Sequence, residues 1–153
     1  MADQRTFIRD YGLPETAEVA SALQEFAGDC RIWLFHGEPG AGKTSLIREL
    51  CRQLGVDVHQ VNSPTFGLMN RYLGPEEIYH FDLYRIRRET ELFDMGMDEV
   101  FASGAWCFVE WPELLDHLRP FRYLNIRITH PAGDGSIRSL QAHLEISATL
   151  THS

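Results

Sequence analysis

The chain has 153 residues, of which 44% are hydrophobic and 24% charged, and this balance predicts one soluble folded domain over residues 1–153. The formal net charge of −8 argues against direct binding to nucleic acid, because that affinity depends on neutralising phosphates. We therefore expect no DNA partner, and RNA only indirectly through other proteins. No apolar run can span a bilayer and no signal peptide is present, so we expect a cytoplasmic protein without a membrane partner.

The first part of the chain predicts helices around a buried strand. Residues 14–27 favour a helix, because Pro14 suits a first turn and apolar residues then recur on one face. The continuous apolar run 32–35 is typical of a strand buried on both faces of a parallel sheet. Residues 43–54 predict a second helix, which Gly55 ends.

The rest of the chain predicts shorter elements. Residues 74–77 indicate a turn, so the segments on either side of it form a hairpin. Strands are predicted at 58–61, 66–73, 78–81, 106–109, 122–129 and 137–147, and short helices at 89–103, broken at Gly96, and at 112–118. Together the elements predict an α/β fold with a mixed parallel and antiparallel sheet flanked by helices.

A phosphate-binding loop is predicted between the first strand and the second helix. Gly37-Glu38-Pro39-Gly40-Ala41-Gly42-Lys43-Thr44 matches the pattern G-x-x-x-x-G-K-[ST] in its proper context, after a strand and opening a helix. The glycines let backbone N–H groups turn towards phosphate oxygens, and the helix N-terminus adds positive charge. Lys43, the only lysine in the chain, would reach the β- and γ-phosphates, Thr44 would bind Mg²⁺, and Ser45 would line the nucleotide site. The motif predicts a P-loop NTPase-like domain.

Two further apolar strands stop at a carboxylate. Residues 78–81 are followed by Asp82, and residues 106–109 by Glu110. Strand ends next to a phosphate loop are where a magnesium ligand and a group that positions the nucleophile are expected. We expect at least one of these acids to handle Mg²⁺ or water, but the sequence does not assign the base and the metal ligand between them.

Other chemical side chains allow a bland interpretation beside a functional one. Residues 62–65 form either a turn held by a proline or a switch-like loop in which Ser63 or Thr65 senses the γ-phosphate or positions water. On its own Trp111 favours packing. His80 is interpreted as a structural histidine with satisfied ring nitrogens, and no transition-metal site is assigned. The three cysteines are expected to be small buried residues.

Four segments together resemble the TsaE family, small bacterial ATPases of tRNA threonylcarbamoyladenosine biosynthesis. They are the phosphate loop, Ser-Pro-Thr-Phe at 63–66, His-Phe-Asp-Leu-Tyr-Arg at 80–85 and Val-Glu-Trp-Pro at 109–112. The resemblance covers about residues 14–130. It implies an ATPase that uses ATP and Mg²⁺ and resets a complex of the partner proteins TsaB and TsaD, which modify adenosine 37 of tRNA.

The resemblance also assigns roles to individual residues. It makes Lys43 the phosphate lysine, Thr44 and Glu110 magnesium ligands, Asp82 an acid needed for hydrolysis, Trp111 an aromatic near the nucleotide, Ser63 and Thr65 part of a switch-like loop, and Thr16 a neighbour of the adenine. The loop departs from the family, because Glu38-Pro39 replaces the more common Asp-Leu and Pro39 removes one backbone N–H.

Three other functions are open to a phosphate-loop protein. A small kinase would carry a mobile lid with arginines, a role that Arg85, Arg87 and Arg88 can fill. A GTPase is disfavoured because no Asn-Lys-x-Asp segment exists. A nucleotide-dependent interaction module with little turnover of its own overlaps with the TsaE resemblance.

Overall fold

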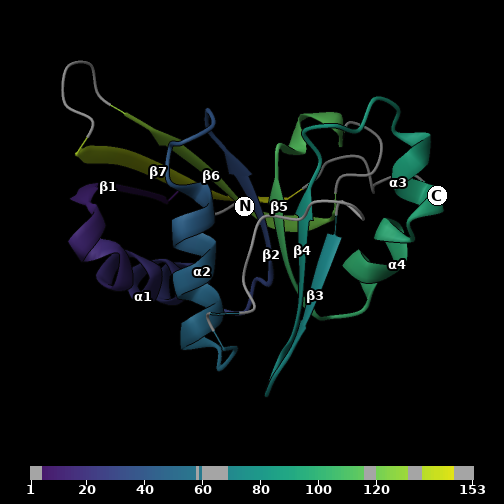
Figure 1. The fold of residues 1–153 in the computed structure, drawn as a ribbon, viewed down its shortest axis with the longest axis horizontal. Helices are drawn as coiled ribbons and strands as arrows, with labels where there is room; N and C mark the ends of the chain where they lie inside the picture. The colour runs from purple at the N-terminus through teal and green to yellow at the C-terminus, as the bar shows by residue number, and fades with distance from the viewer. Residues whose placement is uncertain (1–4, 58, 60–68, 116–119, 131–135, 147–153) are drawn as a thin grey trace.

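The computed structural model describes residues 5–57, 59, 69–115, 120–130 and 136–146 (Figure 1). Its elements are β1 (Thr6–Gly12), η1 (Leu13–Glu15), α1 (Thr16–Ala27), β2 (Ile32–His36), α2 (Lys43–Gln53), β3 (Met69–Leu73), β4 (Glu77–Asp82), α3 (Thr90–Asp94), α4 (Met97–Ala102), β5 (Trp106–Glu110), η3 (Pro112–Leu114), β6 (Arg122–Thr129) and β7 (Ile137–Ile146).

The strands form a seven-stranded sheet in the order β1-β7-β6-β2-β5-β4-β3. Its four central strands, β6, β2, β5 and β4, run parallel to one another. The outer strands are antiparallel additions: β3 pairs with β4 as a hairpin, β7 pairs with β6, and β1 pairs with β7. The predicted α/β fold with a mixed sheet is therefore confirmed.

Helices cover both faces of the sheet, with α1 and α2 on one side and α3 and α4 on the other (Figure 1). The two faces of β2 show how the sequence fills both layers. Trp33 and Phe35 belong to the core that includes the buried residues of α1 and α2, whereas Leu34 between them packs into the core that includes α3 and α4. Successive side chains of a strand point to opposite faces, so a continuous apolar run is what a strand between two helical layers requires.

Most predicted elements occur within a few residues of their expected bounds, and one element was missed. The strand β1 was not predicted, because apolar and polar residues do not alternate along it: Phe7 and Ile8 are followed by the charged Arg9 and Asp10. Such a pattern suits an edge strand, which has only one neighbour, here β7. The three cysteines are buried, as predicted.

Some sequence predictions fall partly or wholly on residues that the structure leaves out. The strand predicted at 58–61 and the loop at 62–65 lie outside the described residues, and of the strand predicted at 66–73 only β3 is described. Where a helix over 112–118 was predicted, the structure has the single 3-10 turn η3, and residues 116–119 are outside the description. Among the described residues, no helix is long and apolar enough to cross a membrane.

Candidate functional site

The carboxyl ends of three parallel strands meet where residues 37–42 leave β2 and enter α2. There β4 ends at Asp82 and β5 at Glu110, and these two residues are register partners across the sheet. Glu110 is also the register partner of Phe35, near the end of β2. In open α/β sheets, ligands bind outside the carboxyl ends of the strands. Both predicted acids therefore lie at the carboxyl ends of the parallel strands, the same end of the sheet as the phosphate-loop motif.

A cleft of about 380 Å³ opens at this edge. It brings together residues from four separate parts of the sequence. Its lining consists of Pro39, Gly40, Gly42, Lys43, Thr44, Ser45, Asp82, Tyr84, Glu110, Trp111 and Arg138. One cleft thus contains two carboxylates, two cationic side chains, two hydroxyl residues and two aromatic rings, next to the first turn of α2.

The glycine-rich loop adopts conformations that its glycines make accessible. Gly40 and Gly42 have φ angles of 83° and 108°, and Gly42 immediately precedes α2. The loop is also braced from β7, because Arg138 Nε donates a hydrogen bond of 3.1 Å to the carbonyl of Ala41. A Cβ atom at Gly42 would lie only 2.6 Å from Arg138 Nε. The glycine therefore permits both the backbone turn and the close approach of the arginine.

Lys43 is 4% exposed and points into the cleft from the first turn of α2. Its ammonium donates a hydrogen bond of 2.5 Å to the carbonyl of Gly37 and lies 3.8 Å from the centroid of the Trp111 ring. Loss of water around the ammonium lowers the pKa of Lys43, while the carboxylates of Glu110 and Asp82 act in the opposite direction. The side chain is thus a desolvated cation beside two acids.

The two acids differ in their surroundings. Glu110 is 3% exposed, and its Oε2 atom lies 2.6 Å from Nε2 of the fully buried His80. Asp82 is half-buried and accepts a hydrogen bond of 3.1 Å from the backbone N–H of Tyr84. Burial raises the pKa of Asp82 above its ordinary value, with a further increase from the charge of Glu110, and the Tyr84 N–H opposes the shift.

The donor atoms of the cleft fit a magnesium ion. Within the described residues no three His, Cys, Asp or Glu side chains form a metal cluster. The cleft offers instead the carboxylates of Asp82 and Glu110 and the hydroxyl of Thr44. Mg²⁺ prefers such hard oxygen donors, uses only one or two carboxylates, and completes its coordination with water and phosphate oxygens. These three residues are therefore the ones in the cleft that could hold such an ion.

Trp111 adopts an unusual backbone conformation at the rim of the cleft. Its φ and ψ angles are both 58°, in the left-handed region, although a residue before a proline normally prefers an extended conformation. The Trp111 ring packs on Tyr84 with 4.7 Å between centroids, and the backbone N–H of Trp111 donates to the carbonyl of Phe35. Strained conformations of this kind concentrate at functional sites, and here the strain directs an indole towards Lys43.

Comparison with known proteins gives a family for this constellation. Residues 12–138 match the family model described as "Threonylcarbamoyl adenosine biosynthesis protein TsaE". The chain belongs to the TsaE family. A TsaE protein of Rickettsia typhi is 36% identical over 117 residues, which cover 74% of this chain and 81% of the relative. One of Haemophilus influenzae is 42% identical over 81 residues, 51% of this chain and 49% of the relative.

A solved structure supports the fold of this TsaE family member. The crystal structure of Bacillus subtilis YdiB superposes with a TM-score of 0.69. The superposed region covers 96% of this chain and 90% of the YdiB chain. At 24% sequence identity the similarity concerns the fold alone. The family and the fold that the motifs predicted are both confirmed.

The structure locates most residues that the TsaE resemblance singled out. Lys43, Thr44, Asp82, Glu110 and Trp111 line the cleft, together with Pro39, Gly40, Gly42 and Ser45. Gly37 and Ala41 contribute backbone carbonyls that accept bonds from Lys43 and Arg138, whereas the Glu38 side chain is exposed. Ser63 and Thr65 lie outside the described residues.

Thr16 lies in a second hollow, of about 360 Å³, which it shares with Leu13, Arg48 and Glu49. Thr44 and Ser45 line this hollow as well as the main cleft, so the two are contiguous along the first turn of α2. The Thr16 hydroxyl donates a hydrogen bond of 2.7 Å to the carbonyl of Leu13. Thr16 thus lies near the helix that follows the glycine-rich loop, in a hollow next to the main cleft.

Sequence reasoning missed two lining residues, Tyr84 and Arg138. Tyr84 belongs to the segment 80–85, and its position two residues beyond a strand-end acid was an available signal. No local signal distinguished Arg138 from the other arginines, because its position in the cleft depends on β7 pairing beside β6. Both ring nitrogens of His80 are hydrogen-bonded, as predicted. One partner is the Tyr72 hydroxyl, and the other is Glu110, one of the two acids of the cleft.

Proposed function

We propose that this chain is a Mg²⁺-dependent ATPase that acts in tRNA threonylcarbamoyladenosine biosynthesis with a TsaB–TsaD-type partner complex, which ATP hydrolysis resets between rounds of modification. The relatives in Rickettsia typhi and Haemophilus influenzae are named tRNA threonylcarbamoyladenosine biosynthesis protein TsaE. The observation that carries the proposal is the convergence of Lys43, Asp82 and Glu110 on one cleft at the phosphate loop.

The charges in the cleft suit hydrolysis of a triphosphate. A water oxygen bonds to the γ-phosphorus while the bond to the bridging oxygen of ADP breaks, and little covalent chemistry is required of the protein. Lys43 and the loop N–H groups would neutralise the phosphates, and Thr44 and Glu110 would hold Mg²⁺. Asp82 would position the water or accept its proton. When bound, the metal would neutralise charge on the β- and γ-phosphate oxygens.

Contact with tRNA is proposed to be indirect. The chain has 22 acidic against 14 basic residues, and such an excess of negative charge repels a phosphate backbone. A protein partner that itself binds the tRNA avoids this repulsion, which agrees with an ATPase subunit that regulates a complex.

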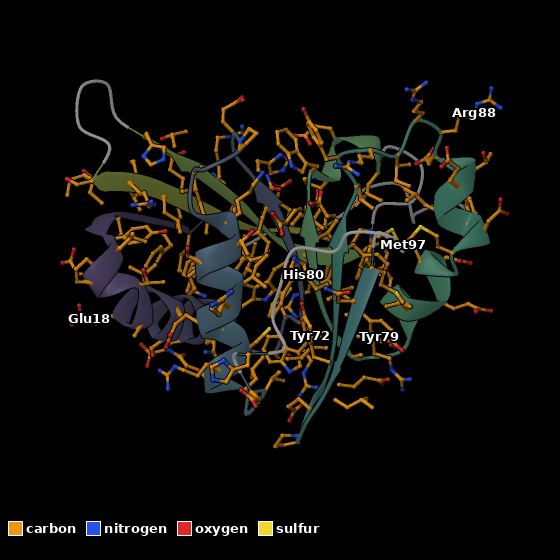
Figure 2. All side chains as sticks on the ribbon, in the orientation of Figure 1. Glu18, Tyr72, Tyr79, His80, Arg88 and Met97 are labelled. Atoms are coloured by element: carbon orange, nitrogen blue, oxygen red, sulfur yellow. The ribbon has the colours of Figure 1, made fainter. Side chains whose placement is uncertain are left out.

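The test measures inorganic phosphate released from ATP, with and without the TsaB–TsaD pair. We expect turnover that requires Mg²⁺, rises with the partners and is lost in Lys43→Ala and Asp82→Ala. Arg88→Ala, an exposed residue outside the cleft on the segment before α3, serves as the matched control and should keep wild-type turnover (Figure 2). Turnover that neither the partners nor these two cleft variants change would refute the proposal.

The small-kinase alternative is tested in the same assay. Arg85, Arg87 and Arg88 are exposed and do not line the cleft, so any role as a lid would need a change of conformation. Stoichiometric transfer of the γ-phosphate to a metabolite, in place of release as inorganic phosphate, would favour the kinase and exclude the ATPase.

A further inference from the structure

A chain of buried polar side chains leads away from the cleft behind Glu110. The Glu110 carboxylate contacts His80 Nε2 at 2.6 Å, the other ring nitrogen of His80 lies 3.1 Å from the Tyr72 hydroxyl, and Asn70 Nδ2 lies 3.3 Å from the same hydroxyl. His80 is 0% exposed, Tyr72 3% and Glu110 3%. Figure 2 shows Tyr72 and His80 close together in the middle of the molecule. These hydrogen-bonded side chains thus connect the cleft to the buried part of the sheet.

For an ionised Glu110 and a neutral imidazole, the chemistry of the groups sets one direction for these hydrogen bonds. An ionised Glu110 only accepts, so His80 Nε2–H is the donor to it. In the neutral imidazole Nδ1 is then an acceptor, which the Tyr72 O–H satisfies, and the Tyr72 oxygen accepts from the Asn70 amide. Each group in the chain is paired with a complementary one. A satisfied buried network of this kind fixes the orientation of its members.

The register of the sheet explains why this row of hydrogen-bonded side chains reaches the cleft. Asn70 and His80 are partners between β3 and β4, and Asp82 and Glu110 are partners between β4 and β5. His80 is two residues before Asp82 on the same strand, so its side chain shares a face with Asp82 and lies diagonally opposite Glu110. That face carries Phe108 and the core beneath α2, the helix that begins with Lys43 and Thr44.

We propose that His80 is a positioning residue for magnesium: held by Tyr72, it fixes the Glu110 carboxylate in the orientation in which Glu110 binds the ion at the cleft. His80 does not line the cleft, so its effect is exerted through Glu110. The bond to His80 uses Oε2, and a carboxylate keeps acceptor capacity for a metal. Partners behind a metal ligand typically change metal affinity 10- to 100-fold when they are removed. The inference rests on the proposed role of Glu110 in binding Mg²⁺.

For each variant, ATP affinity is measured first in EDTA and then at increasing concentrations of Mg²⁺. The titration gives the Mg²⁺ concentration at which half of the metal-dependent gain in ATP affinity is reached. Mn²⁺ binding followed by electron paramagnetic resonance gives an independent readout of the metal. The variants are His80→Leu, which removes the donor at similar volume, and His80→Gln, whose amide nitrogen is the same number of bonds from Cα as Nε2. Tyr72→Phe removes only the hydroxyl that orients the imidazole, and Glu110→Gln is the reference for the metal ligand.

We expect His80→Leu to raise the half-effective Mg²⁺ concentration about 10- to 100-fold and to weaken Mn²⁺ binding in parallel, with ATP affinity in EDTA unchanged. Tyr72→Phe should raise the Mg²⁺ concentration by a smaller factor, and His80→Gln should restore most of the wild-type value. Tyr72→Phe preserves the packing, so it keeps the inference testable if His80→Leu does not fold.

Three results would overturn the inference, and the first two separate its failure from that of the proposed function. If Glu110→Gln weakens the Mg²⁺ response while His80→Leu and Tyr72→Phe match the wild type, the metal ligand stands and the positioning role is wrong. If Glu110→Gln itself leaves the Mg²⁺ response unchanged, the proposed metal role of Glu110 fails, and the inference falls with it. Equal losses of ATP affinity with and without Mg²⁺ in the His80 and Tyr72 variants would show a merely structural effect.

Discussion

The ammonium of Lys43 lies 3.8 Å from the centroid of the Trp111 indole and donates to the carbonyl of Gly37. The lysine of the phosphate loop is therefore held by the face of an aromatic ring and by the first residue of the loop itself. A cation over an indole is attracted by the negative face of the ring, and this attraction is stronger where water is excluded. Any anion that binds in the cleft competes with both contacts for the same ammonium.

This competition predicts a fluorescence signal for nucleotide binding. The other two tryptophans, Trp33 and Trp106, are 0% and 8% exposed in the core, so Trp111 is the one that lines the cleft. We expect ATP to change the tryptophan emission as Lys43 moves from the indole to the phosphates. Trp111→Phe should abolish the change, whereas Trp106→Phe, the matched control away from the cleft, should keep it. A change that persists in Trp111→Phe would contradict this role of the Lys43–Trp111 contact.

Lys43 should titrate below an ordinary lysine. Burial lowers its pKa from 10.5, because the charged form loses water, although nearby carboxylates oppose the shift. Since Lys43 is the only lysine, reductive methylation with ¹³C gives one lysine signal besides the α-amine. Its midpoint in the folded protein should lie below that of the same chain unfolded in urea. ATP should move the midpoint upwards, because phosphate charge stabilises the ammonium. Equal midpoints in the folded and unfolded chains would refute the predicted desolvation.

Asp82→Asn should increase stability while it removes turnover. Burial raises the pKa of Asp82 above 3.8, so the ionised carboxylate costs more in the folded than in the unfolded chain. That cost is fully present above the folded pKa and disappears as the pH falls through the folded pKa towards 3.8. The asparagine oxygen can still accept the Tyr84 N–H bond, which limits other effects.

Urea denaturation across this range measures the effect. We expect Asp82→Asn to have the higher free energy of unfolding at about pH 7, with a difference from wild type that shrinks as the solution is acidified. Asp94→Asn, at an exposed position on α3, is the control and should show no such trend. A variant that is less stable than wild type at neutral pH would show that Asp82 makes a net favourable interaction in the folded protein.

Local patterns predicted the centre of the sheet and brought several of the residues that line the cleft to attention, for physical reasons that the structure makes visible. The run from Ile32 to Phe35 could be assigned because a strand between two helical layers needs apolar residues on both faces. Asp82 and Glu110 could be placed at one edge because both follow such runs, and parallel strands put their carboxyl ends on the same side.

The remainder depends on long-range pairing. Arg138 reaches the cleft only because β7 lies antiparallel to β6 and starts at the edge where the loop turns, and no periodicity near Arg138 carries that information. The partnership of His80 with Glu110 likewise depends on the register between β4 and β5. The edge strand β1 was missed because a strand with one neighbour can carry charged side chains such as Arg9.

The loop glycines give a prediction that separates backbone strain from crowding by Arg138. Gly40 and Gly42 both have positive φ, so alanine costs about 1–2 kcal/mol in conformation at either position. A Cβ at Gly40 has no atom within 4 Å, whereas one at Gly42 would lie 2.6 Å from Arg138 Nε. Gly42→Ala must therefore also displace the arginine and break its hydrogen bond to Ala41.

We expect Gly42→Ala to lower the free energy of unfolding more than Gly40→Ala does, by about 1 kcal/mol for the lost hydrogen bond. Thermal or urea denaturation of both variants measures the difference. The control is the same pair of substitutions in an Arg138→Ala background, where the crowding is absent and the excess cost at Gly42 should disappear. An excess that survives in that background would mean that Gly42 is required by the loop backbone itself and not by its contact with Arg138.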